Sequence, residues 1–582
     1  MQTFIAVCAL NGAELDPAQT RALRQRLTAR LGASTRWREL PGMAMGGTFE
    51  PLSLDGETWI VADARVDARD ELAGELHLPH IPPDEELILR AWEKWGEDCV
   101  NHFIGDFAFA IWDGRQKKLF AARDGFGIRA LYHAQVDGVV VVANQMLAAC
   151  AYPALPCRPN QAFIADFLLL GMPGDREIAS FEGISRLPSG HTLVAQRQAV
   201  VRKYWSLPIE EELRFKNPQE YVERFRDIFE RAVEDRLRDP KITLSASGGM
   251  DSSAVAAAIT SIARKRNLPL DLRGVSVATS HPQDEERRWA AQMAAHVNMP
   301  VDFIELEKYT LFGDIDLDEN DGQLDDQTQN DLTWAFDSAV SAHSKKLFTG
   351  VGGDAVLFPS NSYWLNDIKR GRLAKAAQAA RQFRSRTGQT MPFYIRTALR
   401  RQRPTDSPAT IPPDWIDADF AAAHHLTERG EATRRKHIHL HPTHPDAYRI
   451  LGFKEWQFIF EKQTHARFEK LMPFFDVRVA RFCLRAPSAP WCEDKLLLRE
   501  AMRGLMPENV RTRRKTPFTA DVLGPKFDAV DREAVLQRAE PLVKPYINVE
   551  HLRSHFAEKD QTFIKFGLAR VASLARWLRR FG

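Results

Sequence analysis

The chain contains no long apolar run and no large excess of charge of either sign. No stretch approaches the roughly 18 consecutive apolar residues that a transmembrane helix needs, so we expect no membrane span. The short apolar start at residues 4–10 has no basic residues before it and runs into Asn11-Gly12, which favours a first strand over a signal peptide. A net charge of +2 gives no general reason to expect a nucleic acid or a membrane surface as a partner.

Cysteine is scarce as well, because the chain has only six and none of them stand in Cys-x-x-Cys spacing. This distribution argues against a zinc site and against a disulfide framework. Scattered, unpaired cysteines are typical of proteins that work in a reducing compartment. We therefore expect a cytoplasmic protein without a disulfide framework.

The pattern of apolar residues changes near residue 205. Residues 1–205 contain short apolar strands separated by Asp-Gly dipeptides, which are typical of hairpins and turns, and two helices near 17–31 and 84–97. From about residue 218 helices and strands alternate, as in a parallel sheet with helices on both faces. A chain of 582 residues exceeds what one core normally supports, so the change of pattern predicts at least two domains.

Residues 247–253 carry the clearest functional signal: they read Ser-Gly-Gly-Met-Asp-Ser-Ser, between an apolar strand and a helix-prone run. Two glycines let the backbone approach a ligand closely, and the start of a helix offers unpaired N–H groups and the positive end of its dipole. Such a turn is an anion cradle, and parallel sheets bind ligands at the carboxyl ends of their strands.

This string is not a Walker loop, because no Gly-x-x-x-x-Gly-Lys-Ser/Thr occurs in the chain. A bare Gly-Gly turn is more often structural than functional. A structural turn does not require Asp251 and three hydroxyls, however. The string therefore resembles the pyrophosphate-binding loop of enzymes that split ATP into AMP and pyrophosphate.

Residues 369–403 are rich in lysine and arginine and contain no acidic residue. They are either a solvated pair of basic helices or a docking surface for an acidic or extended peptide. The sequence leaves both interpretations open.

Taken together, these features resemble the class B asparagine synthetase superfamily over nearly the whole chain. In the first part, residues 106–110 and 122–127 match the central hairpin of the glutaminase domain. The resemblance implies an α/β fold with an N-terminal Ntn-hydrolase-like (glutaminase-like) sandwich domain at residues 1–205. It also implies a C-terminal adenine nucleotide α-hydrolase-like synthetase domain at 206–582, with a basic helical insertion at about 360–445.

The first domain departs from the family where its glutaminase chemistry would lie. Working members expose an N-terminal cysteine whose α-amine activates the thiol, whereas this chain begins Met1-Gln2-Thr3 and its nearest cysteine, Cys8, falls inside the first strand. The family's Asn-Gly pair, which stabilises the tetrahedral intermediate, is absent from residues 62–67. We expect an inactive, degenerate glutaminase-like domain that serves as a scaffold.

The second domain keeps the residues that the resemblance assigns to ATP and magnesium. Asp251 and Asp354 match two magnesium-binding aspartates, and two carboxylates from two strand ends are what a hard cation bridging phosphate oxygens requires. Either aspartate alone would more often cap a helix. The resemblance places ATP and pyrophosphate at Ser245, Ser247, Gly248, Gly249, Asp251, Ser252, Ser253, Val277 and Gly350.

Further residues concern the acyl group and the nucleophile. Arg513-Arg514-Lys515 matches an Arg-x-Lys loop whose lysine contacts the reacting phosphate and acyl oxygens, so Lys515 is the expected catalytic residue. Glu469 and residues 472–476 resemble a Glu-Ala-Arg-x-Pro-Phe-Leu-Asp string on the substrate side. Three acidic residues either hold the substrate amine or belong to a polar loop: Asp325, Asp326 and Asp331.

Val351 separates this chain from two familiar branches of the superfamily. Asparagine synthetases carry Glu at this position and β-lactam synthetases carry a Tyr that helps to deprotonate the nucleophile, whereas valine does neither. The branch that fits is the lasso peptide cyclases, or macrolactam synthetases. In that branch an Asp or Glu side chain of a precursor peptide is adenylated, and the α-amine of the peptide attacks it to close an isopeptide-bonded ring. An α-amine has a pKa near 8, so about one-tenth is free base at pH 7 without a strong enzymic base.

This interpretation implies ATP and Mg²⁺ as cofactors, a leader-cleaved precursor peptide as substrate, and a leader peptidase of the same pathway as partner. Two alternatives stay open: a β-lactam or carbapenam synthetase-like enzyme that closes a small β-amino acid, and a degenerate scaffold without activity. The intact ATP-binding residues count against the scaffold. Val351 and the basic residues 369–403 count against a small-molecule ring closer.

Overall fold

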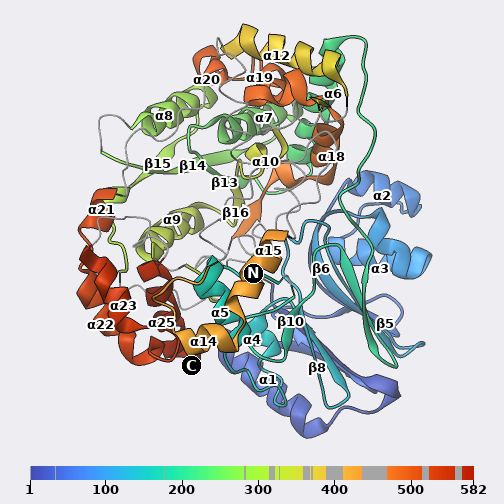
Figure 1. Cartoon of the computed structure of the whole chain (residues 1–582). Coiled ribbons are helices and arrows are strands. Elements are labelled where there is room, and N and C mark those ends of the chain that lie inside the picture. Colours follow the sequence, from blue (N-terminus) through green and yellow to red (C-terminus); the bar gives the residue numbers. More distant parts are fainter. Residues whose placement is uncertain are drawn as a thin grey trace.

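The computed structural model has two layered regions, an antiparallel sandwich built from the first part of the chain and a parallel sheet covered by helices (Figure 1). The sandwich lies at the lower right of the view and the parallel sheet above it and to the left. The structure describes residues 2–32, 34–175, 177–280, 284–313, 322–326, 328–357, 367–368, 371–387, 411–435, 468–513, 524–557 and 567–582.

Two six-stranded antiparallel sheets form the sandwich, with the orders β10-β8-β9-β1-β3-β2 and β12-β11-β7-β6-β5-β4. Successive side chains of strand β1 point to opposite faces of its sheet, and both faces are buried. Phe4, Ala6 and Cys8 pack into the core between the two sheets, whereas Ile5 and Val7 pack into a second core against helices. The strands are β1 (Phe4–Ala9), β2 (Arg36–Leu40), β3 (Met43–Gly47), β4 (Leu52–Ser53), β5 (Thr58–Asp67), β6 (Ile104–Asp113), β7 (Lys118–Arg123), β8 (Tyr132–Val136), β9 (Val139–Ala143), β10 (Ile184–Arg186), β11 (His191–Ala195) and β12 (Ala199–Lys203).

The Asp-Gly turn signal and the two predicted helices of this region are confirmed. Asp137 and Gly138 have φ angles of 48° and 77° and form the two-residue turn between β8 and β9, a conformation that Asp-Gly favours. The first helix is α1 (Pro17–Leu31), whose N-cap Asp16 accepts a backbone N–H of the first turn at 2.8 Å. The second helix is α3 (Asp84–Trp95).

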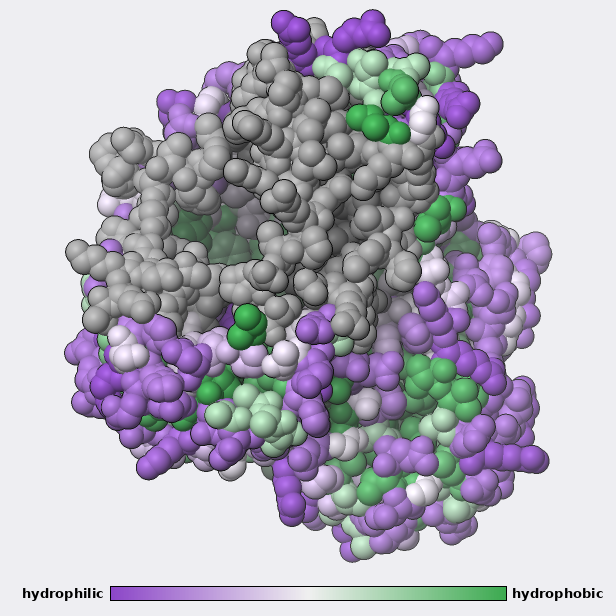
Figure 2. Space-filling model, in the orientation of Figure 1, coloured by the Kyte–Doolittle hydropathy of each residue, from purple (hydrophilic) through white to green (hydrophobic). Residues whose placement is uncertain are grey.

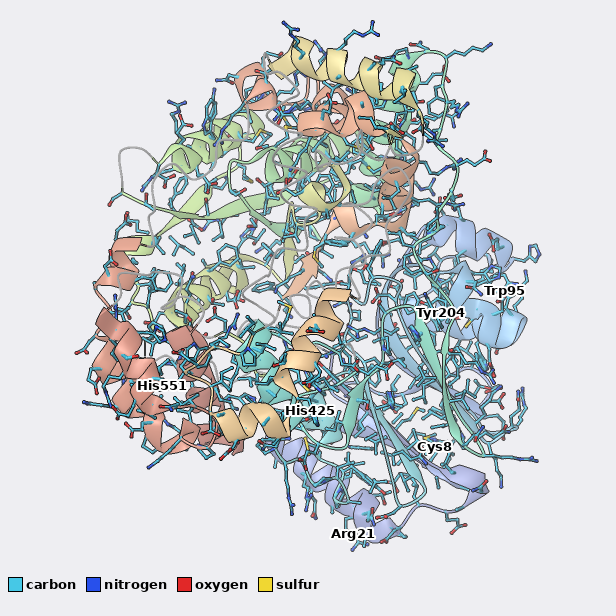
Figure 3. All side chains as sticks on the ribbon, in the orientation of Figure 1. Cys8, Arg21, Trp95, Tyr204, His425 and His551 are labelled. Atoms are coloured by element: carbon cyan, nitrogen blue, oxygen red, sulfur yellow. A yellow bond between two sulfur atoms is a disulfide. The ribbon has the colours of Figure 1, made fainter. Side chains whose placement is uncertain are left out.

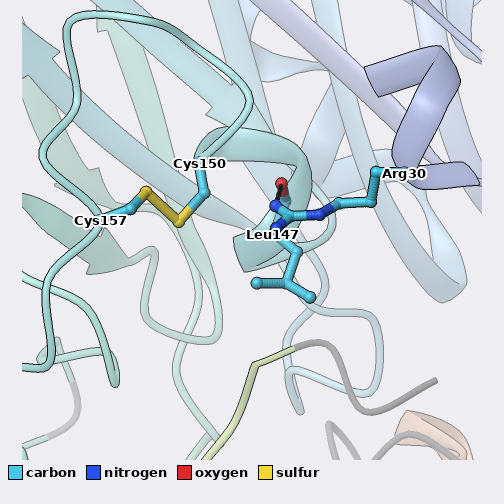
Figure 4. The surroundings of a disulfide bond; sticks show 4 residues. All are labelled: Arg30, Leu147, Cys150 and Cys157. Atoms are coloured by element: carbon cyan, nitrogen blue, oxygen red, sulfur yellow. Dashed lines mark hydrogen bonds between the residues drawn. A yellow bond between two sulfur atoms is a disulfide. The ribbon is translucent and has the colours of Figure 1, made fainter. Parts of the chain in front are cut away.

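One expectation from the cysteine pattern is wrong, because Cys150 and Cys157 form a disulfide (Figure 4). The chain turns back on itself after α4 (Met146–Ala149), where Leu155 donates its N–H to the Tyr152 carbonyl at 3.1 Å. This reversal brings the two Cα atoms to 5.6 Å, a normal disulfide separation. Spacing alone did not indicate the pair, since the cysteines are seven positions apart and their contact depends on local turns.

The second region is a five-stranded parallel sheet with the order β15-β14-β13-β16-β17. Helices α7 and α8 lie above this sheet in the view and α9 lies below it, so both faces are covered (Figure 1). This arrangement confirms the predicted parallel sheet. The elements are α6 (Pro218–Glu234), β13 (Lys241–Ser245), α7 (Met250–Arg266), β14 (Asp271–Ala278), α8 (Glu285–Val297), β15 (Val301–Glu305), α9 (Asn330–His343), β16 (Lys346–Phe348) and β17 (Glu469–Leu471).

The last helix of the chain, α25 (Ala569–Phe581), returns to the sandwich. Its residues Leu574 and Trp577 share one apolar core with Ile5 and Val7 of β1. Apolar packing therefore joins the two regions. The domain boundary near residue 205 stays a prediction. The remaining α-helices in the described ranges are α2 (Arg69–Glu75), α5 (Gln161–Leu170), α10 (Gly353–Leu357), α12 (Leu373–Thr387), α14 (Ala418–Ala423), α15 (Leu426–Arg435), α18 (Val477–Arg485), α19 (Leu496–Ala501), α20 (Glu508–Thr512), α21 (Gly524–Asp528), α22 (Arg532–Val543) and α23 (Val549–Ser554).

Within the described ranges, no helix is both long enough and apolar enough to pass through a bilayer. Figure 2 shows hydrophilic residues over much of the described surface on the face that it presents. Much of the expected insertion at about 360–445 lies outside the described residues. Its described parts include the helices α12, α14 and α15, and of the basic residues 369–403 only 371–387 are described.

Candidate active site

The predicted pyrophosphate loop forms the expected strand, turn and helix. Strand β13 ends at Ser245, and α7 begins at Met250 directly after the two glycines. Gly248 has a φ of +66°, and a Cβ on it would lie 2.6 Å from the backbone nitrogen of Ala290 on α8. No larger residue fits there, because the backbone of α8 closes the space behind the loop.

The hydroxyls of the loop bond to one another across the turn. Ser247 Oγ lies 2.9 Å from Ser252 Oγ, and the Ser252 hydroxyl donates to the Gly249 carbonyl at 3.2 Å. Ser253 is buried in the first turn of α7. These bonds fix the loop at the positive end of a 17-residue helix, where the N–H groups of the first turn have no carbonyl partner within the helix.

A second glycine-rich loop packs against the first. Strand β16 pairs in parallel with β13, so the chain after Phe348 emerges beside α7. A Cβ on Gly350 would lie 2.5 Å from the Ser252 nitrogen, and a Cβ on Gly353 would lie 2.3 Å from Cγ of Asp251. The two loops interlock, which explains why glycine stands at both positions.

Two predicted magnesium ligands converge on one lysine. The Lys495 ammonium contacts the Asp251 carboxylate and lies 2.6 Å from Oδ1 of Asp354. Lys495 is buried, and both it and Asp494 adopt left-handed backbone conformations directly before α19, with φ of 56° and 48°. Non-glycine residues in that conformation are strained and are common at functional sites.

This donor set fits a magnesium ion that is shared with phosphate oxygens. Mg²⁺ is usually held by one or two carboxylates together with substrate phosphates and water. Asp251 and Asp354 supply two carboxylates at one position, and the described residues contain no cluster of three or more His, Cys, Asp or Glu side chains that could hold a metal alone. Sequence reasoning missed Lys495, because its only local signal is a lysine at the start of a helix.

The remaining ATP-binding candidates lie at the ends of neighbouring strands. Ser245 is the last residue of β13 and pairs with Val275 of β14. Val277 follows two residues later in β14, where it pairs with Ile304 of β15. Ser245, Val277 and Gly350 therefore lie at the carboxyl edge of the sheet, and their roles toward the nucleotide stay predictions.

Lys515 lies outside the described residues, but the segment that leads to it is described as far as Arg513. Arg513 donates from Nη1 to the Gly248 carbonyl at 3.3 Å, and its guanidinium carbon lies 5.1 Å from the ring centre of Trp289. The Arg-x-Lys segment thus begins at the pyrophosphate loop.

Glu469 is engaged by cations from three separate segments. Its carboxylate contacts Arg129, lies 2.5 Å from Nζ of Lys346, and lies 3.6 Å from Nη1 of Arg65. Burial alone would raise the pKa of Glu469, but Arg129, Arg65 and Lys346 more than offset this effect and hold the pKa well below its usual range. Glu469 is therefore a fixed anion and a poor proton acceptor.

The same network of charges continues across the junction between the sandwich and the parallel sheet. Asp476 lies 2.8 Å from Nη1 of Arg236 and 2.8 Å from Nη2 of Arg478, and Arg236 also lies 3.1 Å from Asp67 of β5. Burial opposes ionisation of Asp476, but these two arginines hold its pKa well below the usual range. Ion pairs as well as apolar packing join the two regions.

The acidic candidates on the substrate side have partners within the chain. Oδ1 of Asp326 accepts the backbone N–H of Thr328 at 2.9 Å, and Oδ2 of Asp331 accepts the Thr310 hydroxyl at 3.0 Å. Asp325 is buried. These contacts support the polar-loop interpretation, while a role in holding an amine stays a prediction.

Cys8 lies in the interior of the sandwich, between β3 and β9 (Figure 3). Its side chain is fully buried, and burial raises the pKa of the thiol to about 12. A thiol with this pKa is protonated at neutral pH and is not a nucleophile.

One further pocket, with a cavity volume of ≈ 70 Å³, lies between α22 and α25. None of the predicted site residues line it. Its lining consists of Phe312, Val535, Arg538, Ala539, Ala572, Ser573, Ala575, Arg576 and Arg579.

Family comparison matches both regions of the chain. The model of the asparagine synthase family matches residues 224–579, and the model of a glutamine amidotransferase domain matches residues 49–205. Together with the observed sheets, these matches confirm the predicted fold class of an Ntn-hydrolase-like domain followed by a synthetase domain.

Several curated proteins are similar to part of the chain. Asparagine synthetase [glutamine-hydrolyzing] 3 of Bacillus subtilis (strain 168) is 30% identical over 193 residues, which cover 33% of this chain and 31% of that protein. Asparagine synthetase [glutamine-hydrolyzing] 2 of the same strain is 30% identical over 222 residues, covering 35% and 29%. Amidase chyE of Penicillium rubens is 29% identical over 207 residues, covering 34% and 29%.

These alignments span about a third of the length of the relatives. Among solved structures, a glutamine phosphoribosylpyrophosphate amidotransferase from B. subtilis is 12% identical, covering 52% of this chain and 81% of that chain. The TM-score between the two structures is 0.24.

Proposed function

The chain belongs to the asparagine synthase family, and on that premise we propose that it is an ATP-dependent carbon–nitrogen ligase that forms AMP. A carboxylate oxygen attacks the α-phosphate of ATP, which gives an acyl adenylate and releases pyrophosphate. An amine then attacks the acyl carbon, which forms an amide and releases AMP. The observation that carries this proposal is the convergence of Asp251 and Asp354 beside the 247–253 loop.

The residues of this site suit the first step. The backbone of Gly248 and Gly249 and the first turn of α7 offer N–H groups and a positive dipole to the departing pyrophosphate. Asp251 and Asp354 would hold magnesium, which supplies positive charge between phosphate oxygens when it is bound. Lys495 adds a buried ammonium at the same position, so this position carries positive charge both with and without bound magnesium.

We further propose that the acyl group and the amine belong to one peptide, as in the lasso peptide cyclases. Val351 is 37% exposed on the loop after β16, where an apolar side chain cannot accept a proton. Glu469 is held as an anion by three cations, so it is a poor proton acceptor as well. A reaction whose nucleophile is an α-amine, with a pKa near 8, needs less help from a base than an amide or a protonated side-chain amine does.

The substrate in this proposal is a leader-cleaved precursor peptide, and its Asp or Glu side chain is joined to its own α-amine. A leader peptidase must act first, because the α-amine has to be exposed. Arg381 and Arg384 of the basic helix α12 are exposed and offer positive charge to an acidic peptide. Leu373, at the start of the same helix, is 64% exposed.

The decisive experiment is mass spectrometry on the full chain with ATP, magnesium and a candidate core peptide, chosen from a short open reading frame beside the gene. We expect the peptide to lose one water, with AMP and pyrophosphate as the nucleotide products. Asp251→Asn should abolish the water loss, whereas Asp227→Asn, an exposed aspartate on α6, should not affect it. Production of ADP and phosphate would contradict adenylation. Closure of a small β-amino acid, without dehydration of any peptide, would favour a β-lactam synthetase-like enzyme instead.

A further inference from the structure

Trp289 lies directly behind the pyrophosphate loop. It belongs to the first half of α8, and a Cβ on Gly248 would lie 2.9 Å from Cβ of Trp289 and 2.8 Å from the carbonyl oxygen of Glu286. This part of α8 therefore forms the back wall of the loop. A change at Trp289 acts on the loop without any intermediate layer.

Two guanidinium groups lie near the Trp289 indole. The guanidinium carbon of Arg513 is 5.1 Å from the ring centre and that of Arg288 is 4.6 Å from it. Both distances fall within the range in which the negative face of an aromatic ring attracts a cation. The indole therefore gathers two positive charges beside the loop that is expected to hold a highly charged anion.

Arg513 is tied to the loop as well as to the indole. Its Nη1 donates to the Gly248 carbonyl at 3.3 Å. The planar guanidinium, with several N–H donors in a fixed fork, suits the oxygens of a phosphate group. Its long side chain has many rotamers, so something must hold it in this orientation, and the indole face does so.

The ring nitrogen of Trp289 also needs an explanation. Trp289 Nε1 is buried and has no hydrogen-bond acceptor among the residues that the structure describes. A tryptophan that only filled space would be replaceable by an apolar residue without such an N–H group. The cation-binding face of the indole gives a reason for tryptophan at this position.

We propose that Trp289 is a positioning residue that holds the Arg513 guanidinium beside the 247–253 loop, where it binds the pyrophosphate part of ATP. This inference rests on the proposed adenylation and adds the residue that orients one of its phosphate-binding groups. Because Arg513 precedes Lys515 by two residues, the same contact fixes where the segment carrying Lys515 begins.

The test measures binding of magnesium pyrophosphate and of AMP to the full chain by isothermal titration calorimetry. Trp289→Leu should weaken pyrophosphate binding by about five- to tenfold, the size of a partly buried cation–π contact, and leave AMP binding within about twofold. Trp289→Phe keeps an aromatic face and should retain most of the affinity. The matched control is Trp59→Leu, which removes an indole stacked on Arg38 at 4.2 Å in the sandwich and should change neither affinity.

A second set of variants separates positioning from a merely structural role. In an Arg513→Gln background, the further change Trp289→Leu should cost no additional pyrophosphate affinity, because Trp289 acts through Arg513. If Trp289→Leu does not fold, Arg513→Gln alone keeps the idea testable, because it should weaken pyrophosphate binding by at least as much and leave AMP binding unchanged. Wild-type pyrophosphate affinity in Trp289→Leu, an equal loss of AMP and pyrophosphate affinity, or additive effects of the two changes would each overturn the proposal. Failure of the wild type to bind either ATP or pyrophosphate would instead contradict the proposed function.

Discussion

The Nζ atom of Lys495 lies 2.6 Å from Oδ1 of Asp354, and the same ammonium contacts Asp251. One buried cation thus links two aspartates that come from different strand ends. The aspartates would repel each other without a shared positive charge. Lys495 therefore keeps them together before magnesium and ATP arrive.

Replacing Lys495 by methionine tests this role, because methionine keeps the length of the side chain and removes its charge. We expect AMP formation to fall by about 10² to 10³, as happens when a fixed group that stabilises transition-state charge is removed. The variant should also gain more thermal stability from added magnesium than the wild type does, since the metal would then supply the positive charge that Lys495 no longer provides. Lys265→Met, which removes a surface pair with Glu230 at 2.7 Å, is the control and should cost less than about 1 kcal/mol.

Gly248 should tolerate no side chain. In Gly248→Ala, the positive φ costs about 1 kcal/mol and the new Cβ meets the backbone of α8 at 2.6 Å, so urea unfolding should show a larger loss of stability and ATP binding should weaken. Gly504→Ala is the matched control, because Gly504 has a φ of +80° with no heavy atom within 4 Å of an added Cβ. An equal effect of the two changes would show that the backbone angle, and not the close approach of α8, requires glycine.

The sandwich should have no glutaminase activity. Glutamine incubated with the protein should release no ammonia above a heat-killed control, because the Cys8 thiol is buried and its pKa is raised to about 12. Cys8→Ala should leave ring closure unchanged, and Cys8 should react with iodoacetamide only after unfolding. Release of ammonia that is lost in Cys8→Ala would show that the domain is more than a scaffold.

The ion pairs of Glu469 should make stability depend on pH in acid. Since the folded pKa of Glu469 lies below its unfolded value of about 4.3, its contribution is fully present above that pH and is lost as the pH falls further. Glu469→Gln removes the counter-charge of Lys346 and one of two carboxylates beside Arg129, the other being Asp63, and should lower the free energy of unfolding at pH 7 by about 3 to 5 kcal/mol.

The difference between Glu469→Gln and the wild type should narrow as the pH is lowered from 5 towards 3. Urea unfolding at several pH values measures it. Glu223→Gln, which changes an exposed glutamate on α6, is the control and should follow the wild type at every pH. A difference that stays constant with pH would mean that folding does not lower the pKa of Glu469.

The parts of the site that lie close together in sequence could be predicted, and the parts that depend on distant contacts could not. The 247–253 loop has its strand, glycines and helix start within one short run, so local rules identify it. Lys495 is 244 residues from Asp251, and nothing local indicates that they meet. Glu469 likewise draws Arg129 from 340 residues away and Lys346 from 123 residues away, so its character as a fixed anion follows only from the fold.

Lys515 remains the residue on which the reaction step itself should depend. A long cationic side chain contributes little to a core, so Lys515→Ala should fold normally and should still bind ATP, whose expected contacts come mainly from the 247–253 loop. Ring closure should nevertheless fall sharply, because charge that develops between the acyl carbon and AMP loses its counter-charge. Lys515→Arg should restore only part of the rate, since a planar guanidinium cannot place its charge at one point as an ammonium does. Mass spectrometry of the peptide product measures all three proteins, and ring formation by Lys515→Ala at nearly the wild-type rate would remove Lys515 from the mechanism.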